Sequence, residues 1–166
     1  HSSKVLKVKF TPNGQYIASA GNDKKVIIRD WKKSKRFRSL PGHRHVVTSF
    51  AFHPNGKEMI SCSLEGSILV WNYKRKKQLS QLKLVEKPVR SCMYSSDGKK
   101  ILGVFQKSYL KTWQLTDSAL LGSFKGHKKA ITSLDISKNG KRLISLSNDK
   151  TVKTWSIRSK SLVKSY

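Results

Sequence analysis

The residues of this sequence that could do acid–base or nucleophilic chemistry are its five histidines, its nine Asp and Glu residues and its hydroxyl side chains. His45 and His53 lie in or beside predicted turns, whereas His1, His43 and His127 recur at related positions. No residue pair has catalytic or metal-ligand spacing, no glycine-rich phosphate loop occurs, and paired carboxylates are missing. We therefore expect no enzyme activity, no metal, no cofactor and no small-molecule substrate.

The composition indicates a globular chain that attracts polyanions. The 166 residues leave room for one sizeable core. Thirty-five Lys and Arg against nine Asp and Glu give a net charge of +26, which draws acidic protein surfaces or nucleic acid. Hydrophobic residues make up 37% of the chain, too many for a disordered basic tail, and no run reaches the ~18 residues of a membrane span. Cys62 and Cys92 are too few for a disulfide framework, and we expect both in the core.

Internal repetition organises the chain. An offset of 42 residues aligns four turns of the form Pro/Ser/Lys, Asn/Asp, Gly without a gap, at Gly14, Gly56, Gly98 and Gly140. The same offset aligns the three related histidines with Val85, and aligns Arg29 with Trp71, Trp113 and Trp155. This period lies within the roughly 40 to 45 residues of one propeller blade. The sequence therefore predicts a single domain of four blades, at about residues 1–42, 43–84, 85–126 and 127–166.

Each copy has the pattern of four strands. Short runs of β-branched and aromatic residues lie between Gly, Asn and Asp turns, and no helical period is sustained. In the last copy the predicted strands are 131–136, 142–147, 152–157 and 161–166. Four antiparallel strands cannot bury two sheet faces alone, so the copies must stack face to face. The predicted fold class is all-β, a β-propeller of four-stranded antiparallel blades.

The last copy carries the motif of a known repeat. Gly126-His127, the turn 138–140, Ser145, Asn148-Asp149 and Trp155 resemble the WD-repeat signature at its usual spacing, and the resemblance covers the whole chain. In that family the His, Ser, Asp and Trp of one repeat form a buried hydrogen-bonded tetrad, which ties the turn loops to the third strand. The resemblance therefore implies a structural tetrad of His127, Ser145, Asp149 and Trp155.

The other copies keep only part of this tetrad. The second has His43, Ser61 and Trp71, with Glu65 at the acid position, and the first has His1, Ser19 and Asp23, with Arg29 in place of Trp. Trp31 lies two residues beyond Arg29, so we expect its ring to cover part of the surface of the missing indole. The third copy keeps only Trp113, with Val85, Gly103 and Lys107 at the other positions. There we expect packing of Val85, Val104 and Trp113 to replace the hydrogen bonds.

Strand alternation sorts the charges by end of the blade, because the first and third turns of each copy lie at one end. That end carries sixteen Lys and Arg against three carboxylates, and the other end carries ten against four. Trp31, Phe37 and Tyr73 interleave with the first set and would allow stacking on unpaired bases, although packing is their commoner role. The candidate contacts to a polyanion or an acidic partner are Lys32, Lys33, Lys35, Arg36, Lys74, Arg75, Lys76, Lys77, Lys99, Lys100, Lys141 and Arg142.

The resemblance implies a rigid, non-catalytic scaffold that mediates protein–protein interactions in a multiprotein complex. The alternative is an RNA-binding or ribonucleoprotein-assembly subunit that uses the more basic end of the blades. The runs 32–36 and 74–77 are also typical of nuclear import signals, so we expect an intracellular protein of the nucleus or cytoplasm, with the nucleus favoured. The resemblance implies a ring of seven or eight blades, so we expect either that this segment belongs to a longer propeller chain or that two copies pair face to end through exposed sheets. The absence of Met before His1 favours the longer chain.

Overall fold

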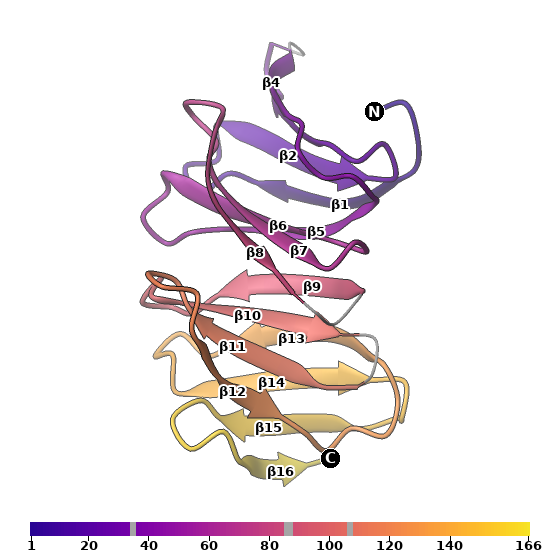
Figure 1. Ribbon diagram of the computed structural model, residues 1–166, viewed down its shortest axis with the longest axis vertical. Helices are drawn as coiled ribbons and strands as arrows, with labels where there is room; N and C mark the ends of the chain where they lie inside the picture. The colour runs from indigo at the N-terminus through magenta and orange to yellow at the C-terminus, as the bar shows by residue number, and fades with distance from the viewer. Residues whose placement is uncertain (34–35, 85–87, 106–107) are drawn as a thin grey trace. The chain divides into compact units, whose positions relative to one another are not determined.

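The computed structural model describes residues 1–33, 36–84, 88–105 and 108–166, and the side chains of residues 36 and 37 are also outside the description. The described residues form sixteen strands in four sheets and no helix (Figure 1). Within each sheet the four strands follow one another in chain order. The all-β prediction of four-stranded antiparallel blades is therefore confirmed. None of the described segments is a helix long and apolar enough to span a membrane.

The first two sheets are regular meanders. The first contains β1 (Val5–Phe10), β2 (Tyr16–Gly21), β3 (Val26–Asp30) and β4 (Arg36–Leu40). The second contains β5 (Val47–Phe52), β6 (Glu58–Ser63), β7 (Ser67–Asn72) and β8 (Lys77–Lys83). Equivalent strands of the two sheets begin about one repeat apart, as the offset of 42 residues predicts.

The last two sheets follow the same plan. The third contains β9 (Val89–Tyr94), β10 (Lys100–Phe105), β11 (Leu110–Gln114) and β12 (Leu120–Phe124). The fourth contains β13 (Ile131–Ile136), β14 (Arg142–Ser147), β15 (Val152–Ser156) and β16 (Leu162–Ser165). The predicted strands of this copy differ from the observed ones only at the ends of the last two.

The first turn of each sheet is closed by the Asn/Asp-Gly pair. The side-chain oxygens of Asn13, Asn55, Asp97 and Asn139 each accept a hydrogen bond from the backbone amide two residues on. The glycines that follow have φ between 65° and 72°, a left-handed conformation that costs glycine little and other residues more. The four turns are therefore built alike, and the second strand of each sheet begins at the same repeat position.

The chain divides into two compact units, His1–Cys92 and Met93–Tyr166, with the boundary inside β9. In the first unit, β1 and β2 lie against β5, and a core forms between the sheets from residues such as Ala18, Ile28, Phe50 and Trp71. In the second unit, Leu102, Val104, Phe124, Ile131 and Trp155 belong to one core. Cys62 and Cys92 are buried free thiols, as predicted.

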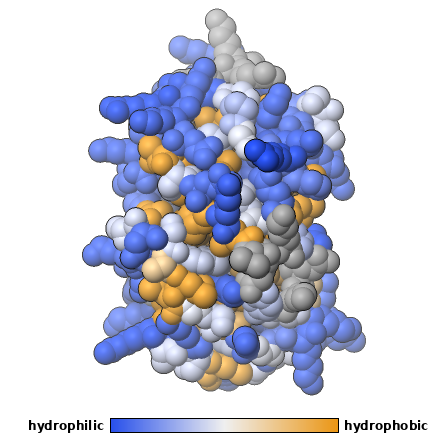
Figure 2. All heavy atoms as spheres, in the orientation of Figure 1, coloured by the Kyte–Doolittle hydropathy of each residue, from blue (hydrophilic) through white to orange (hydrophobic). Residues whose placement is uncertain are grey.

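Strand burial differs sharply between equivalent positions. β5 is largely buried, whereas every residue of β1 is exposed, including Val8 and Phe10. Ile144 and Leu146 of β14 are also exposed. On the face seen in Figure 2, hydrophilic residues dominate and hydrophobic residues show as scattered patches.

Candidate functional site

The four tetrad residues of the fourth blade meet in one hydrogen-bonded chain. His127 lies before β13, Ser145 on β14, Asp149 in the β14–β15 turn and Trp155 on β15. Trp155 Nε1 donates to Ser145 Oγ at 2.8 Å, Ser145 Oγ lies 2.7 Å from His127 Nε2, and His127 Nδ1 lies 2.9 Å from Asp149 Oδ2. Ser145 is only 1% exposed. These hydrogen bonds therefore tie the connection before β13 and the β14–β15 turn to β15.

Protonation of this network follows from the state of Asp149. Burial opposes ionisation of its carboxyl group, but hydrogen bonds from the Thr151 hydroxyl, the Lys128 amide and His127 outweigh burial and hold the pKa of Asp149 well below its ordinary value. The carboxylate is thus an acceptor, and His127 donates to it from Nδ1. In the tautomer that carries the proton on Nδ1, Nε2 accepts from the Ser145 hydroxyl, which leaves the Ser145 oxygen to accept from Trp155.

In the second and fourth blades, the glycine before the network histidine lies against the tryptophan of the same blade. A Cβ atom at Gly126 would be 3.1 Å from Trp155 Cη2, and one at Gly42 would be 2.8 Å from Trp71 Cη2. A side chain at Gly42 would force the Trp71 ring to shift, and one at Gly126 would require the Trp155 ring to move by a few tenths of an ångström. The Gly-His pair therefore reflects this close approach of backbone to ring.

The second blade builds the same network around a longer acid. His43 Nδ1 lies 2.8 Å from Glu65 Oε1, His43 Nε2 lies 2.7 Å from Ser61 Oγ, and Trp71 Nε1 donates to Ser61 Oγ at 2.8 Å. Burial opposes ionisation of Glu65, but hydrogen bonds from Ser67, His43 and the Arg44 amide hold its pKa below the ordinary value. Glutamate thus occupies the aspartate position without loss of the network.

A fifth polar residue joins both complete networks and was missed from the sequence. Thr151 Oγ1 donates to Asp149 Oδ1 at 2.6 Å and lies 3.2 Å from His127 Nδ1. Ser67 makes the equivalent contacts with Glu65 and His43. Ser67 and Thr151 occupy the same repeat position, two repeats apart. The hydroxyl group at both positions was the sequence signal that could have identified this fifth residue.

The first blade has three of the four partners and a space where the indole would lie. His1 Nδ1 lies 2.8 Å from Asp23, and His1 Nε2 lies 2.7 Å from Ser19 Oγ. Arg29 is exposed. An open hollow of about 340 Å³ lined by residues including His1, Ser19 and Arg29 adjoins this network. The structure thus leaves the position of the missing tryptophan uncovered.

The prediction that Trp31 covers this position is wrong. Trp31 lies beyond the end of β3, is 45% exposed and donates from Nε1 to Gly14 O at 3.0 Å. Tyr73, one repeat later, donates in the same way to Gly56 O at 2.8 Å. Both rings therefore fasten the first turn of their blade, because the residue after the third strand already faces that turn.

The third blade holds its tryptophan with hydrophobic and aromatic contacts. Val85 and Lys107 are outside the described residues, so the packing expected of Val85 is not tested. Val104 and Trp113 are buried. The Phe105 ring lies 5.9 Å from the Trp113 ring and stacks on the Tyr109 ring at 5.5 Å. Phe105 and Tyr109 occupy the positions of Ser147 and Thr151 in the last copy, so aromatic rings replace two hydroxyl residues there.

The Ser, His and acid side chains of these blades are hydrogen-bonded in the same order as in a catalytic triad, but the serine is not accessible to a substrate. Ser61 is 0% exposed, and its oxygen already accepts from Trp71. A nucleophile must reach its substrate and pass a proton to its base. The networks are therefore built to position loops. Among the residues that the structure describes, no group of three or more His, Cys, Asp or Glu could hold a metal ion.

In the first unit, the candidate cations follow β3 and β7. Lys32 and Lys33 are exposed in the turn after β3, where Asp30 Oδ1 accepts from both of their amides at 3.0 Å, and Lys74 to Lys77 are exposed around the turn before β8. Asp30 thus adds a carboxylate that our count of this end omitted. Lys35 and the side chains of Arg36 and Phe37 are outside the description. Tyr73 is buried, so its predicted availability for base stacking is wrong.

In the second unit, the candidates come from two different sheets. Lys99 and Lys100 lie where β10 begins, and Lys141 and Arg142 lie where β14 begins. Lys100, Lys141 and Arg142 line one hollow, together with Arg158 and Lys160 of the β15–β16 turn. The last two were counted at this end of the blade but were not among the candidate contacts. Their position in the third turn of the last copy was the signal.

Comparison with known families agrees with this architecture. The profile of the WD domain, G-beta repeat, matches residues 1–30, 34–72 and 118–156, which together make up more than half of the chain. Most of the third copy, where the polar partners are replaced, is not matched. A search of curated proteins found no match. The repeats, the four-stranded sheets and the family profile together show that this chain belongs to the WD-repeat family.

Proposed function

We propose that this chain is a non-catalytic scaffold that holds acidic protein partners within a multiprotein complex. WD repeats generally act as protein-interaction scaffolds. In this proposal the two compact units belong to one domain, with blades at about 1–42, 43–84, 85–126 and 127–166. Its contact region is the set of basic turns, defined as the first and third turns of each blade with the cations that flank them.

One observation carries the proposal: the basic turns present cations on a fixed backbone. Lys74, Arg75 and Lys76 are exposed, and the Arg75 amide donates to Asn72 Oδ1 at 3.0 Å. Between described residues, every ion pair joins a histidine to a carboxylate, so none neutralises these cations. Fixed, unneutralised charges favour association with an acidic surface, because they gain attraction without losing an internal partner.

The test reverses charge in one set of turns and compares it with a matched set. Lys74, Arg75, Lys76 and Lys77 are changed to Glu together, and the control changes Lys24, Lys25, Lys129 and Lys150 to Glu. Fluorescence anisotropy measures binding of a labelled glutamate-rich peptide to each protein. We expect the first variant to bind much more weakly than the control. Equal loss in both would show that net charge alone governs binding.

RNA binding is the second candidate, favoured by Trp31. Its exposed ring lies 5.5 Å from Lys32 Nζ, so an aromatic face and a cation are adjacent in one basic turn. Bases stack on such rings while phosphates contact the cations. A salt titration separates the candidates, because phosphate contacts give a steep dependence of log affinity on log salt for any RNA sequence. Trp31→Ala should weaken RNA binding much more than peptide binding.

We also propose an intracellular location, with the nucleus favoured over the cytoplasm. The runs at 32–36 and 74–77 support it, since short basic segments are read by import receptors. A fluorescent fusion with Lys74 to Lys77 changed to Ala should shift toward the cytoplasm. An unchanged distribution would remove this run as an import signal.

A further inference from the structure

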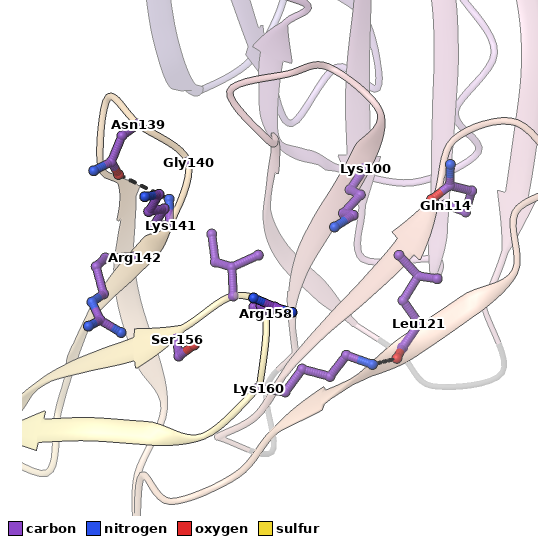
Figure 3. A pocket seen from close by; sticks show the side chains of 11 residues that line it. Lys100, Gln114, Leu121, Asn139, Gly140, Lys141, Arg142, Ser156, Arg158 and Lys160 are labelled. Carbon is purple, nitrogen blue, oxygen red and sulfur yellow. Dashed lines mark hydrogen bonds between the residues drawn. The ribbon is translucent and has the colours of Figure 1, made fainter.

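An open hollow of about 790 Å³ lies in the second unit, between the turns of the fourth sheet and the third sheet (Figure 3). Its walls include five cations, and none of the described residues that line it is Asp or Glu. Lys100 comes from β10 and Arg142 from the start of β14, whereas the other three come from the β13–β14 and β15–β16 turns. The five are Lys100, Lys141, Arg142, Arg158 and Lys160.

The hollow has a fixed frame. Ile157 N donates to Lys141 O at 3.2 Å, which joins the two turns of the fourth sheet. Arg142 N donates to Ser137 Oγ at 2.9 Å, and Lys160 N donates to Ser156 O at 2.8 Å. The Lys160 ammonium also donates to the Leu121 carbonyl on the opposite sheet (Figure 3). The turn backbones that carry these cations are therefore fixed, and the Lys160 ammonium is held in place, which lowers the entropic cost of binding a ligand.

The positive charge of the hollow is poorly compensated within the described chain. The only described ion pairs are those of His1, His43 and His127. Asp97 interacts with Lys100, and a hydrogen bond from Ser95 is the main cause that holds its pKa below the ordinary value. Asp97 thus remains ionised and offsets part of one cation. The remaining repulsion between like charges falls when an anion enters.

The mixture of groups fits a phosphorylated side chain on a peptide. Arg142 and Arg158 carry planar guanidinium groups, which bind phosphate oxygens with two parallel hydrogen bonds. Leu121 and Ile157 add apolar surface, and Gln114 adds an amide that can bond a peptide backbone. In Figure 3, Lys100 and Arg158 extend toward the space between the two sheets.

A single-stranded nucleic acid fits less well. Its recognition depends on bases stacked on aromatic rings along a groove. None of the described lining residues is aromatic. The phosphate contacts are available here, but the stacking contacts are not.

We propose that this hollow binds a phosphorylated segment of a protein partner, with Lys100 and Arg158 on the phosphate. The inference rests on the proposed scaffold function and names the chemistry of one partner. It depends on the turns of the last two blades, whereas the test of the proposed function changes Lys74 to Lys77. The two can therefore fail separately.

The test uses the full chain and a fluorescein-labelled peptide with two adjacent phosphoserines. The probes compared with it are its unphosphorylated twin, its twin with Glu at both positions, and a uridine-only RNA of similar length. We expect the phosphopeptide to bind the most tightly. Changing Lys100 and Arg158 together to Gln should weaken its binding roughly tenfold or more, since two charge-assisted contacts are lost.

The matched control changes Lys24 and Arg44 to Gln, which removes the same two charged groups from exposed positions in the first unit. It should retain nearly full binding, and circular dichroism should show both variants folded. Arg158→Lys keeps the positive charge but loses the two parallel hydrogen bonds of the guanidinium group. This variant should therefore retain only part of the affinity for the phosphopeptide.

Three outcomes would overturn the proposal. Equal binding of the phosphopeptide and its unphosphorylated twin would show that phosphate is not read. Tighter RNA binding that depends on Lys100 and Arg158 would assign the hollow to nucleic acid. Complete competition by inorganic phosphate at the peptide's own concentration would show a site for the free anion rather than for a peptide.

Discussion

The third and fourth blades hold an equivalent tryptophan by different means. Trp155 donates to Ser145 in a chain that continues to His127 and Asp149, whereas the Trp113 indole makes no hydrogen bond to any described residue. Phe105 packs on Trp113 instead. Both indoles are buried, at 1% and 4% exposure.

The difference shows that the third blade has replaced its polar positions as a set. Gly103, Phe105 and Tyr109 stand where the fourth blade has Ser145, Ser147 and Thr151. A buried network that loses one member leaves the others without partners, which costs more than the loss of the whole network. The third blade retains no isolated serine or acid at these described positions.

Ser145→Ala is the strongest way to break this comparison. The change removes the acceptor of the Trp155 N–H and the donor to His127, so unfolding should become easier by about 1–3 kcal/mol. Urea unfolding followed by circular dichroism measures it. Ser133→Ala, at an exposed position of β13, is the control and should change little. Equal losses would mean that the network adds no stability.

Replacing each tryptophan with phenylalanine sharpens the comparison. Trp155→Phe loses a buried hydrogen bond as well as surface area, whereas Trp113→Phe loses mainly area. We expect the first to cost roughly 1 kcal/mol more than the second in free energy of unfolding. Thermal melts of both variants measure the difference. A larger loss at Trp113 would show that aromatic packing holds the indole more strongly.

The His43 network should make stability depend on pH, whereas the apolar packing of the third blade should not. Burial lowers the pKa of His43 from 6.5, although Glu65 opposes the shift. The unfolded chain therefore binds this proton more readily, so this stability is complete above pH 6.5 and declines as pH falls. Denaturation midpoints at pH 7.5 and pH 5 measure it. His43→Gln should flatten this part of the profile, and an unchanged slope would contradict the assignment.

The smallest expected effect concerns the exposed strand β1. β5 is buried at the equivalent position in the next sheet, while Val8 and Phe10 of β1 remain exposed. Exposed apolar strands favour association, so we expect copies of the chain to pair in solution. Sedimentation of the wild type and of Val8→Lys with Phe10→Lys tests this. A wild-type chain that stays monomeric at high concentration would refute it.

Sequence reasoning was most successful where a single residue type is forced by local geometry. The Asn/Asp-Gly turns require a left-handed residue, so their spacing revealed the period and the strands between them. Trp31 is a residue for which sequence reasoning failed. Its alignment with Tyr73 was visible, but strand alternation alone placed its ring on the wrong partner.

The sequence by itself determined the repeat, the strand order, the family and the His, Ser, acid and Trp positions of the polar networks, because these depend on local periodicity and on residue type. The tertiary structure decided which side chains meet across sheets. Lys100 and Arg158 belong to different blades and line one hollow only because the sheets pack together. The same packing buried Tyr73 and left β1 exposed, since burial depends on neighbours that lie far away in the chain.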